Sequence, residues 1–381
     1  MRIAEISRTF LLAAGLSLMT LNYSASADEP LVFVSSFAGG DQGGIHAMSL
    51  DEKSATLKPL HKTAGVENPF FIAVSPDQRF LYSIYAPTFG GKDHEQVAAF
   101  KLEGRSGKMS PLNRQSTKGT ASCFLEVDAT GRTVLMANYS TGSVASYQVK
   151  ADGSLSEPVS FVQHHGSSVN EARQKEPHAH CFVISPNNRF AYSADLGIDQ
   201  IVCYTLDAAT AKLTPAAQPF VRTPPGSGPR HMTFHPNGKS LYVINELLNT
   251  VTLFSFLPDS GMLIERQTIS TLPADYDGVT HTADLKITPN GKFLYGTNRG
   301  HDSIAGYSIA DDGTLTLIEI IPSLGKGPQN LAITKSGEVL LCANMPGNNV
   351  AAFRINAETG KLTASGAPVE VTGASCIRIL E

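Results

Sequence analysis

Tryptophan is absent from this sequence, and charged residues make up only 17 % of its 381 positions. It contains no block of lysine and arginine that could follow a phosphate backbone, and 30 basic residues against 34 acidic ones give a net charge of -4, so nucleic acid is not an expected partner. The five cysteines are odd in number and widely scattered, which does not indicate a disulfide framework. Each lies in an apolar run, where we expect it to act as a small buried side chain; they are Cys123, Cys181, Cys203, Cys342 and Cys376.

The residues that are present favour a soluble all-β protein with a sizeable core. Hydrophobic residues account for 42 % of the chain. The 33 glycines and 22 prolines, together with 11 tyrosines and 18 phenylalanines, indicate many turns that join short strands.

The first 27 residues differ from the rest and predict a secretory signal peptide. Arg2 and Arg8 precede an apolar run over residues 10–21, and the small residues 25–27 fit a cleavage site after Ala27. The run is too short for a membrane-spanning helix, and no later segment could span a bilayer. We therefore expect residues 1–27 to be removed and residues 28–381 to act in the periplasm or outside the cell, without integral membrane association.

An internal repeat dominates the remainder of the chain. Seven similar strand-like stretches begin 46 to 57 residues apart, each with a β-branched residue at its start and an aromatic residue or methionine three places later. Their starts are Ile45, Val97, Val144, Ile201, Val251, Ile304 and Val350. Before six of them, two apolar strands flank a tight turn such as Pro-Asn-Gly.

Each repeat therefore predicts four short antiparallel strands, the size of one propeller blade, and seven repeats predict a seven-bladed β-propeller. The chain begins at residues 31–36 with a match to the second strand of the repeat and ends at residues 375–380 with a match to the first. We expect these two segments to complete one blade and close the ring. Tandem β-sandwiches would not require this register.

Comparison of the repeats with one another identifies candidate functional residues. When the repeats are aligned, each set of equivalent positions forms a column, and a residue that differs from the others in its column needs a reason other than the fold. The column near the start of the first strand reads Phe70, Cys123, His180, Arg230, Ala283 and Gln329. The column just past the second strand reads Ala86, Tyr139, Leu196, Glu246, Arg299 and Met345. The two positions lie at the same end of a blade, so His180, Arg230, Glu246 and Arg299 should converge on one rim of the central channel.

These four side chains suit acid-base chemistry on an anionic substrate with an electrophilic carbonyl. A carboxylate and an imidazole can exchange protons, while two guanidiniums offer forked donors to a carboxylate, a phosphate or a developing oxyanion. The alternative is that Glu246 and Arg299 form a structural ion pair.

Other motifs point to no further chemistry. No carboxylate or cysteine completes a metal-ligand spacing around His164, His165 and His178, so we predict neither a metal ion nor a cofactor. His231 and His235 are expected to be packing or turn residues. The sequence has no Gly-x-Ser-x-Gly elbow, which argues against a serine hydrolase.

At these positions the chain resembles the seven-bladed-propeller lactonase family, which includes bacterial 6-phosphogluconolactonases and fungal carboxy-cis,cis-muconate lactonising enzymes. The motifs that carry the resemblance are ANYSTGSV from Ala137, PHAH from Pro177, GPRHMTFHPNG from Gly228, VINEL from Val243 and TNRGHDSIA from Thr297. The resemblance implies that His180, Arg230, Glu246 and Arg299 form the active site.

The expected activity is hydrolysis of an acidic sugar lactone, a small-molecule substrate. The expected roles are anion binding and oxyanion stabilisation by Arg230 and Arg299, and activation of water by Glu246 or His180. Two alternatives remain: a muconate-type lactonising cycloisomerase that uses the same rim, and a non-enzymatic propeller that binds a protein partner. The sequence does not indicate an oligomeric state.

Overall fold

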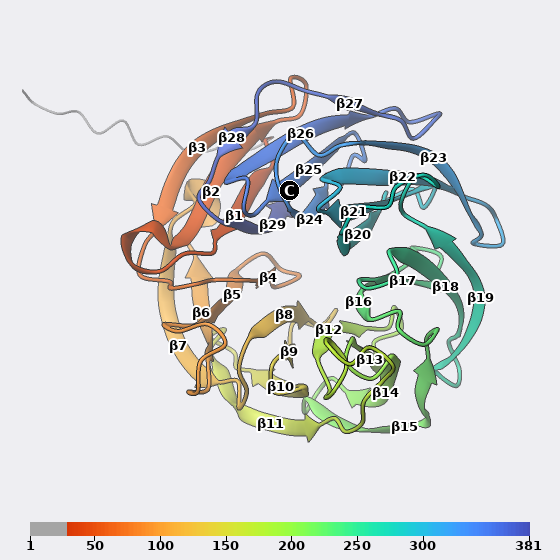
Figure 1. The fold of residues 1–381 in the computed structure, drawn as a ribbon. Helices are drawn as coiled ribbons and strands as arrows, with labels where there is room; N and C mark the ends of the chain where they lie inside the picture. Colours follow the sequence, from red (N-terminus) through yellow and green to blue (C-terminus); the bar gives the residue numbers. More distant parts are fainter. Residues whose placement is uncertain (1–28) are drawn as a thin grey trace, which may run out of the picture.

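Residues 29–381 are described by the structure, a computed structural model, and form seven antiparallel sheets arranged in a ring (Figure 1). Six of these sheets have four strands and one has five. The arrangement is a seven-bladed β-propeller and confirms the predicted fold class. The predicted signal peptide lies outside the described residues.

The blades follow one another along the chain, and in each the strands run outward from the central axis. Blade 1 consists of β29 (Ala374–Leu380), β1 (Leu31–Ser36), β2 (Gly44–Asp51) and β3 (Thr56–Thr63). Blade 2 consists of β4 (Ile72–Val74), β5 (Phe80–Tyr85), β6 (Gln96–Leu102) and β7 (Met109–Ser116); blade 3 of β8 (Ser122–Val127), β9 (Thr133–Asn138), β10 (Ser143–Val149) and β11 (Leu155–Gln163). Blade 4 consists of β12 (Ala179–Ile184), β13 (Phe190–Asp195), β14 (Gln200–Asp207) and β15 (Lys212–Arg222); blade 5 of β16 (Pro229–Phe234), β17 (Ser240–Asn245), β18 (Thr250–Leu257) and β19 (Met262–Ser270). Blade 6 consists of β20 (His281–Ile287), β21 (Phe293–Arg299), β22 (Ser303–Ile309) and β23 (Leu315–Pro322); blade 7 of β24 (Pro328–Ile333), β25 (Val339–Asn344), β26 (Asn349–Ile355), β27 (Leu362–Ala364) and β28 (Val369–Glu370). Two short 3-10 turns, η1 (Gly40–Gln42) and η2 (Gly104–Ser106), lie in blades 1 and 2.

The two ends of the described chain close the ring, as predicted. β29 pairs antiparallel with β1 from Leu31 opposite Leu380 to Ser36 opposite Ala374. The Ser35 and Ser375 hydroxyls hydrogen-bond at 2.9 Å across this junction. Blade 1 is therefore built from both termini, which removes the exposed edges that an open ring would have.

The outer strand of blade 7 departs from the predicted pattern of one strand. It is split into β27 and β28, which pair with different parts of β26. Gly366, with a positive φ of 68°, and Pro368 lie in the gap. Proline has no N–H to donate to the ladder, so the interruption falls where the sequence supports strand pairing least.

Buried tyrosines tie neighbouring blades together at regular positions. Each projects from the second strand of one blade, and its hydroxyl donates to a glycine carbonyl in the outer turn of the next. The bonds are Tyr82 to Gly153 (3.1 Å), Tyr192 to Gly261 (2.6 Å), Tyr242 to Gly313 (2.6 Å) and Tyr295 to Gly360 (2.7 Å). The repeat therefore encodes contacts between blades as well as within them.

A second link between blades uses the turn before the third strand of each blade, at the same end of the propeller as the candidate residues. A side chain in this turn accepts hydrogen bonds from N–H groups of the segment that leads into the inner strand of the next blade. These bonds fix the start of that inner strand. The links are Glu95 to Ala121 and Ser122, Asp199 to Gly226 and Gly228, Asp302 to Gly327, and Asn348 to Gly373.

The five cysteines are free and buried, in agreement with the sequence-based expectation. Residues 29–381 contain no helix that is long and apolar enough to cross a membrane.

Candidate active site

The inner strands carry β-bulges at the column that contains His180 and Arg230. In blade 4, Ala179 pairs with Asp195 and Cys181 with Ala194, so the intervening His180 has no opposite residue. In blade 5, Pro229 pairs with Asn245 and His231 with Ile244, which leaves Arg230 in the same position. A bulge redirects the side chain of its extra residue. The variable column recognised in the sequence is thus the bulge column of the propeller.

The structure brings all four predicted residues together around one cavity of about 190 Å³. Glu246 follows the end of β17 and Arg299 ends β21, so both reach the same mouth of the channel as the bulges. The cavity is lined by Phe70, Phe89, Ala121, Cys123, Tyr139, Arg173, His180, Arg230, Glu246 and Arg299.

Glu246 is the centre of this cluster and binds three arginines. Its Oε2 accepts from Arg230 Nε and from Arg299 Nη2, both at 2.9 Å. Its Oε1 accepts from Arg173 Nη2 at 2.7 Å. The ion pair between Glu246 and Arg299 that was considered from the sequence is therefore present, within a larger network. Arg173 was not identified from the sequence, because it lies in the loop before β12 and belongs to no column of the repeat.

Burial and the surrounding charges set the protonation states. Burial is the largest single influence and raises the pKa of the Glu246 carboxyl, but the surrounding charges, led by Arg299 and Arg230, together lower it to well below the ordinary value. Burial, together with Arg299, lowers the pKa of Arg230 to about 10. Three guanidiniums thus face one carboxylate, which leaves two net positive charges.

His180 is a neutral imidazole in this surrounding. Burial, with Arg230 and His231 as further causes, holds the pKa of His180 well below its usual value. Its Nδ1 lies 3.6 Å from the Cys123 sulfur, and its Nε2 makes no hydrogen bond with any group in residues 29–381. An unpaired imidazole nitrogen that borders a cavity can accept a proton from a bound water molecule.

His178 and His164, two of the histidines weighed as metal ligands, have structural partners instead. His178 stacks on Tyr139 at 4.4 Å between ring centres, and its Nδ1 lies 3.0 Å from the Tyr139 carbonyl oxygen. His164 lies between Asp195 and Tyr204. Within the described part of the chain, no group of three or more His, Cys, Asp or Glu side chains is arranged to hold a metal ion.

His231 and His235 also match the expectation of packing and turn roles. His235 Nε2 lies 2.8 Å from the Gly291 carbonyl oxygen. His231 is buried, and its Nδ1 lies 2.8 Å from Asp284 Oδ1.

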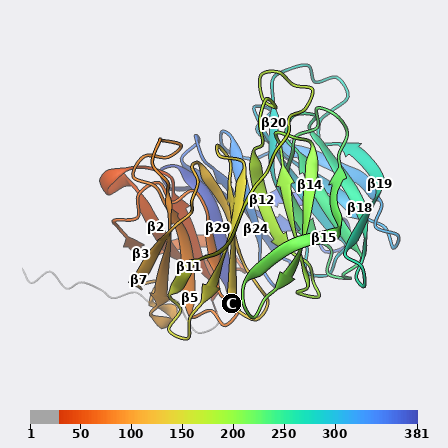
Figure 2. The ribbon, with the colours of Figure 1, turned by 90° about the horizontal axis from the view of Figure 1, so that it is seen from below.

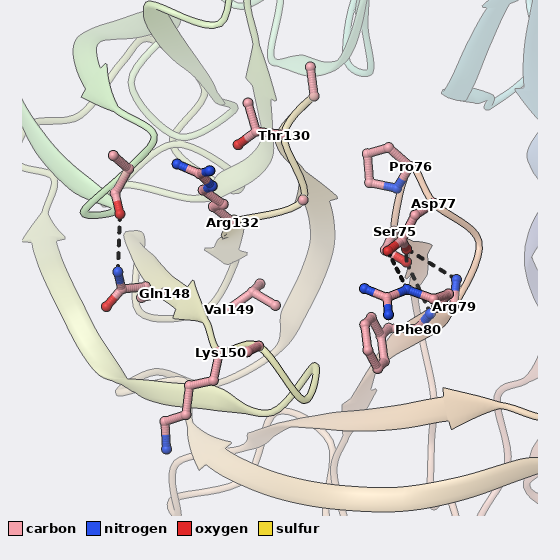
Figure 3. A pocket seen from close by; sticks show the side chains of 14 residues that line it. Ser75, Pro76, Asp77, Arg79, Phe80, Thr130, Arg132, Gln148, Val149 and Lys150 are labelled. Atoms are coloured by element: carbon pink, nitrogen blue, oxygen red, sulfur yellow. Dashed lines mark hydrogen bonds and ion pairs between the residues drawn. The ribbon is translucent and has the colours of Figure 1, made fainter.

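A larger cavity of about 730 Å³ lies away from this cluster (Figure 3). It is lined by the turns 75–80 and 129–132, which follow the inner strands of blades 2 and 3, and by residues 148–151. These turns are at the opposite end of the blades from the bulges, and none of the four predicted residues lines this cavity.

Comparison with known proteins connects this architecture with one family. The family model described as "Lactonase, 7-bladed beta-propeller" matches residues 31–379. A 6-phosphogluconolactonase of Bacillus subtilis is 33 % identical over 350 residues, which cover 91 % of this chain and 97 % of that protein. A 6-phosphogluconolactonase of Formosa agariphila is 33 % identical over 359 residues, with 91 % and 99 % covered. The solved structure of a periplasmic gluconolactonase from Pseudomonas aeruginosa superposes with a TM-score of 0.87 at 28 % identity, over 93 % of this chain and 99 % of that one. The chain described here belongs to the seven-bladed β-propeller lactonase family.

Proposed function

We propose that this protein is a lactone hydrolase that opens an acidic sugar lactone to the aldonic acid at the Glu246 cavity. The observation that carries the proposal is the joint placement of a neutral imidazole and three guanidiniums around one cavity. The imidazole can take a proton from water, and the guanidiniums can stabilise negative charge on the substrate and on the carbonyl oxygen. The 6-phosphogluconolactonases among the relatives support the same reaction class.

In the proposed mechanism, His180 Nε2 accepts a proton from a water molecule as the water oxygen attacks the lactone carbonyl carbon. The carbonyl oxygen becomes an oxyanion that Arg230 and Arg299 stabilise, because their positions are held by hydrogen bonds to the main-chain carbonyls of Ala283 and Thr282. The tetrahedral intermediate then collapses, the bond between the carbonyl carbon and the ring oxygen breaks, and His180 returns the proton to the ring oxygen. The net reaction consumes one water and yields a hydroxy acid.

Glu246 acts in this proposal as a positioning residue for the arginines. Its carboxylate accepts from three guanidiniums, so hydrogen bonds of the protein already occupy both of its oxygens. Of the two bases considered from the sequence, His180 is the one that has an unpaired nitrogen and a neutral resting state.

Titration of the acid released from a panel of lactones tests this function in the purified protein. We expect His180→Gln to lower kcat by about 10²- to 10⁴-fold, the usual contribution of a general base. His235→Gln, which alters a histidine in a turn at the other end of blade 5, serves as the matched control and should retain activity. Parental turnover in His180→Gln would overturn the assigned role, and a parent protein that opens no lactone would overturn the function.

The same preparation separates the two alternative functions. A muconate-type diacid as substrate tests cycloisomerisation, in which a proton moves at carbon and no water is consumed. A binding scaffold predicts that Arg230→Ala changes the affinity for a protein partner and leaves no small-molecule turnover to lose.

We further infer that residues 1–27 direct the protein out of the cytoplasm and that residues 28–381 are the mature enzyme. The sequence pattern at Arg2, Arg8 and Ala27 supports this location, as does the likeness to a periplasmic gluconolactonase. Phosphorylated sugar lactones are cytoplasmic metabolites, so this location favours an unphosphorylated acidic lactone. Cell fractionation and N-terminal sequencing test it: cytoplasmic protein that starts at Met1 would contradict it.

A further inference from the structure

The third arginine of the site, Arg173, is held by a connection that is long compared with its neighbours. Residues 164–178 join β11 to β12, whereas residues 117–121 and 223–228 make the corresponding links before β8 and β16. In the side view the yellow-green loop rises beyond the ends of the strands (Figure 2). Blade 4 therefore adds a segment to the mouth that the repeat does not require.

This loop is anchored by buried polar contacts. Gln174 is fully buried, and its Nε2 donates to Asp199 Oδ1 at 2.7 Å and to the Leu196 carbonyl at 2.8 Å. The Ser168 hydroxyl donates to Asp199 Oδ2, and Asn170 Oδ1 accepts from the Arg173 N–H at 3.1 Å. A buried, hydrogen-bonded anchor keeps the backbone of Arg173 in one place.

Asp199 also positions the segment that carries Arg230. Its carboxylate accepts from the Gly226 N–H at 2.6 Å and from the Gly228 N–H at 2.7 Å, two residues before Arg230. A single buried carboxylate therefore connects the loop of Arg173 with the bulge of Arg230. The two guanidiniums have a defined spacing even though they come from different blades.

Arg173 and Arg299 are partly exposed, whereas Arg230 is buried, and Arg173 differs from Arg299 in its hydrogen bonds rather than in its exposure. The side chain of Arg173 is 33 % exposed, whereas Arg230 is 1 % exposed and Arg299 is 26 % exposed. Both protein bonds of the Arg173 guanidinium use Nη2, which donates to Glu246 and, at 3.1 Å, to the Tyr139 hydroxyl.

The remaining N–H groups of Arg173 are available to a ligand. Nε and Nη1 donate to no group in residues 29–381. By contrast, Arg299 uses Nε, Nη1 and Nη2 on groups of the protein. A guanidinium with free donors at the edge of a cavity matches a phosphate or carboxylate.

We propose that Arg173 is a specificity-determining residue that binds the anionic substituent of the lactone, away from the reacting carbonyl. This inference rests on the proposed lactonase function. It divides the arginines by position: Arg230 and Arg299, fixed by main-chain carbonyls, serve the reacting centre, while Arg173 selects substrates that carry negative charge.

Three lactones test the assignment in the full protein: 6-phosphoglucono-δ-lactone, glucaro-1,4-lactone with a free carboxylate, and neutral glucono-δ-lactone. We expect Arg173→Gln to lower kcat/KM for the preferred anionic lactone by about 10- to 100-fold, mainly through KM, because a charged hydrogen bond to the substituent is lost. The neutral lactone should lose less than the anionic one, because it carries no charged substituent for Arg173 to bind. Arg173→Lys, which keeps the charge but not the fork, should fall between Arg173→Gln and the parent.

The control is Arg132→Gln, which removes an exposed arginine from the distant cavity (Figure 3) and should leave all three values unchanged. The anionic lactone with the larger loss shows whether phosphate or carboxylate is the recognised group. An equal loss for all three lactones in both Arg173 variants, or a parent that opens the neutral lactone as well as the anionic ones, would overturn the inference and leave the hydrolase function standing. Failure of the parent to open any of them would instead overturn the proposed function.

Discussion

Glu246→Gln should destabilise the propeller as well as impair turnover, because it removes the only carboxylate among three guanidiniums of the cavity. The Glu246 and Arg230 side chains are 5 % and 1 % exposed and lie 2.9 Å apart. At a charge separation of about 4 Å and an effective dielectric constant of about 20, their attraction is about 4 kcal/mol. Arg173 and Arg299 are more exposed, so each of their pairs adds only about 0–1 kcal/mol. Since the variant leaves Arg230 buried without its counter-charge, we expect a net loss of about 3–5 kcal/mol.

Urea unfolding at neutral pH measures this loss. Glu265→Gln, at an exposed position on the outer strand β19, is the matched control and should stay within about 0.5 kcal/mol of the parent. Sulfate should stabilise Glu246→Gln more than the parent, because a divalent anion can bind between the unpaired guanidiniums. A Glu246→Gln protein that unfolds within about 1 kcal/mol of the parent, with no sulfate effect, would refute the view that this carboxylate holds the arginines together.

Three further predictions concern a carboxyl on the inner strand β8, a glycine and the closure of the ring. Burial raises the pKa of Glu126 to about 7, so ionisation of this carboxyl costs stability as the pH rises above its unfolded-state pKa. Glu126→Gln should therefore raise the free energy of unfolding in urea by up to about 3 kcal/mol at pH 8, and by much less at pH 5. An equal change at both pH values would contradict this. Gly228 has a φ of 61°, and a Cβ at this position would lie 2.6 Å from Leu247 Cγ, whereas Gly65 has a φ of 74° and open space around it. Gly228→Ala should therefore lower the free energy of unfolding by about 1–3 kcal/mol more than Gly65→Ala does. Similar unfolding midpoints for the two variants would show that the loop adapts. Deletion of residues 374–381 removes the inner strand of blade 1 and should abolish cooperative thermal unfolding, followed by circular dichroism; a sharp transition near that of the parent would show that closure is dispensable.

Much of the fold could be predicted from the sequence because each blade repeats one pattern. The spacing of Ile45 and its six equivalents sets the number of sheets. The match of residues 31–36 to the second strand of the repeat, and of residues 375–380 to the first, predicts how the ring closes. The split of the last outer strand at Pro368 was not anticipated, because a template shared by all blades carries no information on what happens in one of them.

The same reasoning explains which part of the site could be found from the sequence. Seven of the ten residues that line the cavity come from the two variable columns, among them His180 and Glu246. The columns are informative because one corresponds to the bulge of the inner strand and the other to the end of the second strand, and the antiparallel pairing brings both to the same mouth.

Connections that differ in length between blades have no equivalent positions that can be aligned. Arg173 lies on such a connection, and for this reason the comparison of repeats did not identify it. Its presence changes the interpretation of Glu246: with two arginines, the carboxylate could still serve as a base, whereas three guanidinium donors occupy both of its oxygens and stabilise its charged form. We therefore assign the proposed proton-transfer role to His180, whose Nε2 has no hydrogen-bond partner in the described part of the chain. In this propeller the repeat places the reacting groups, while an irregular loop supplies the charge by which we expect the substrate to be selected.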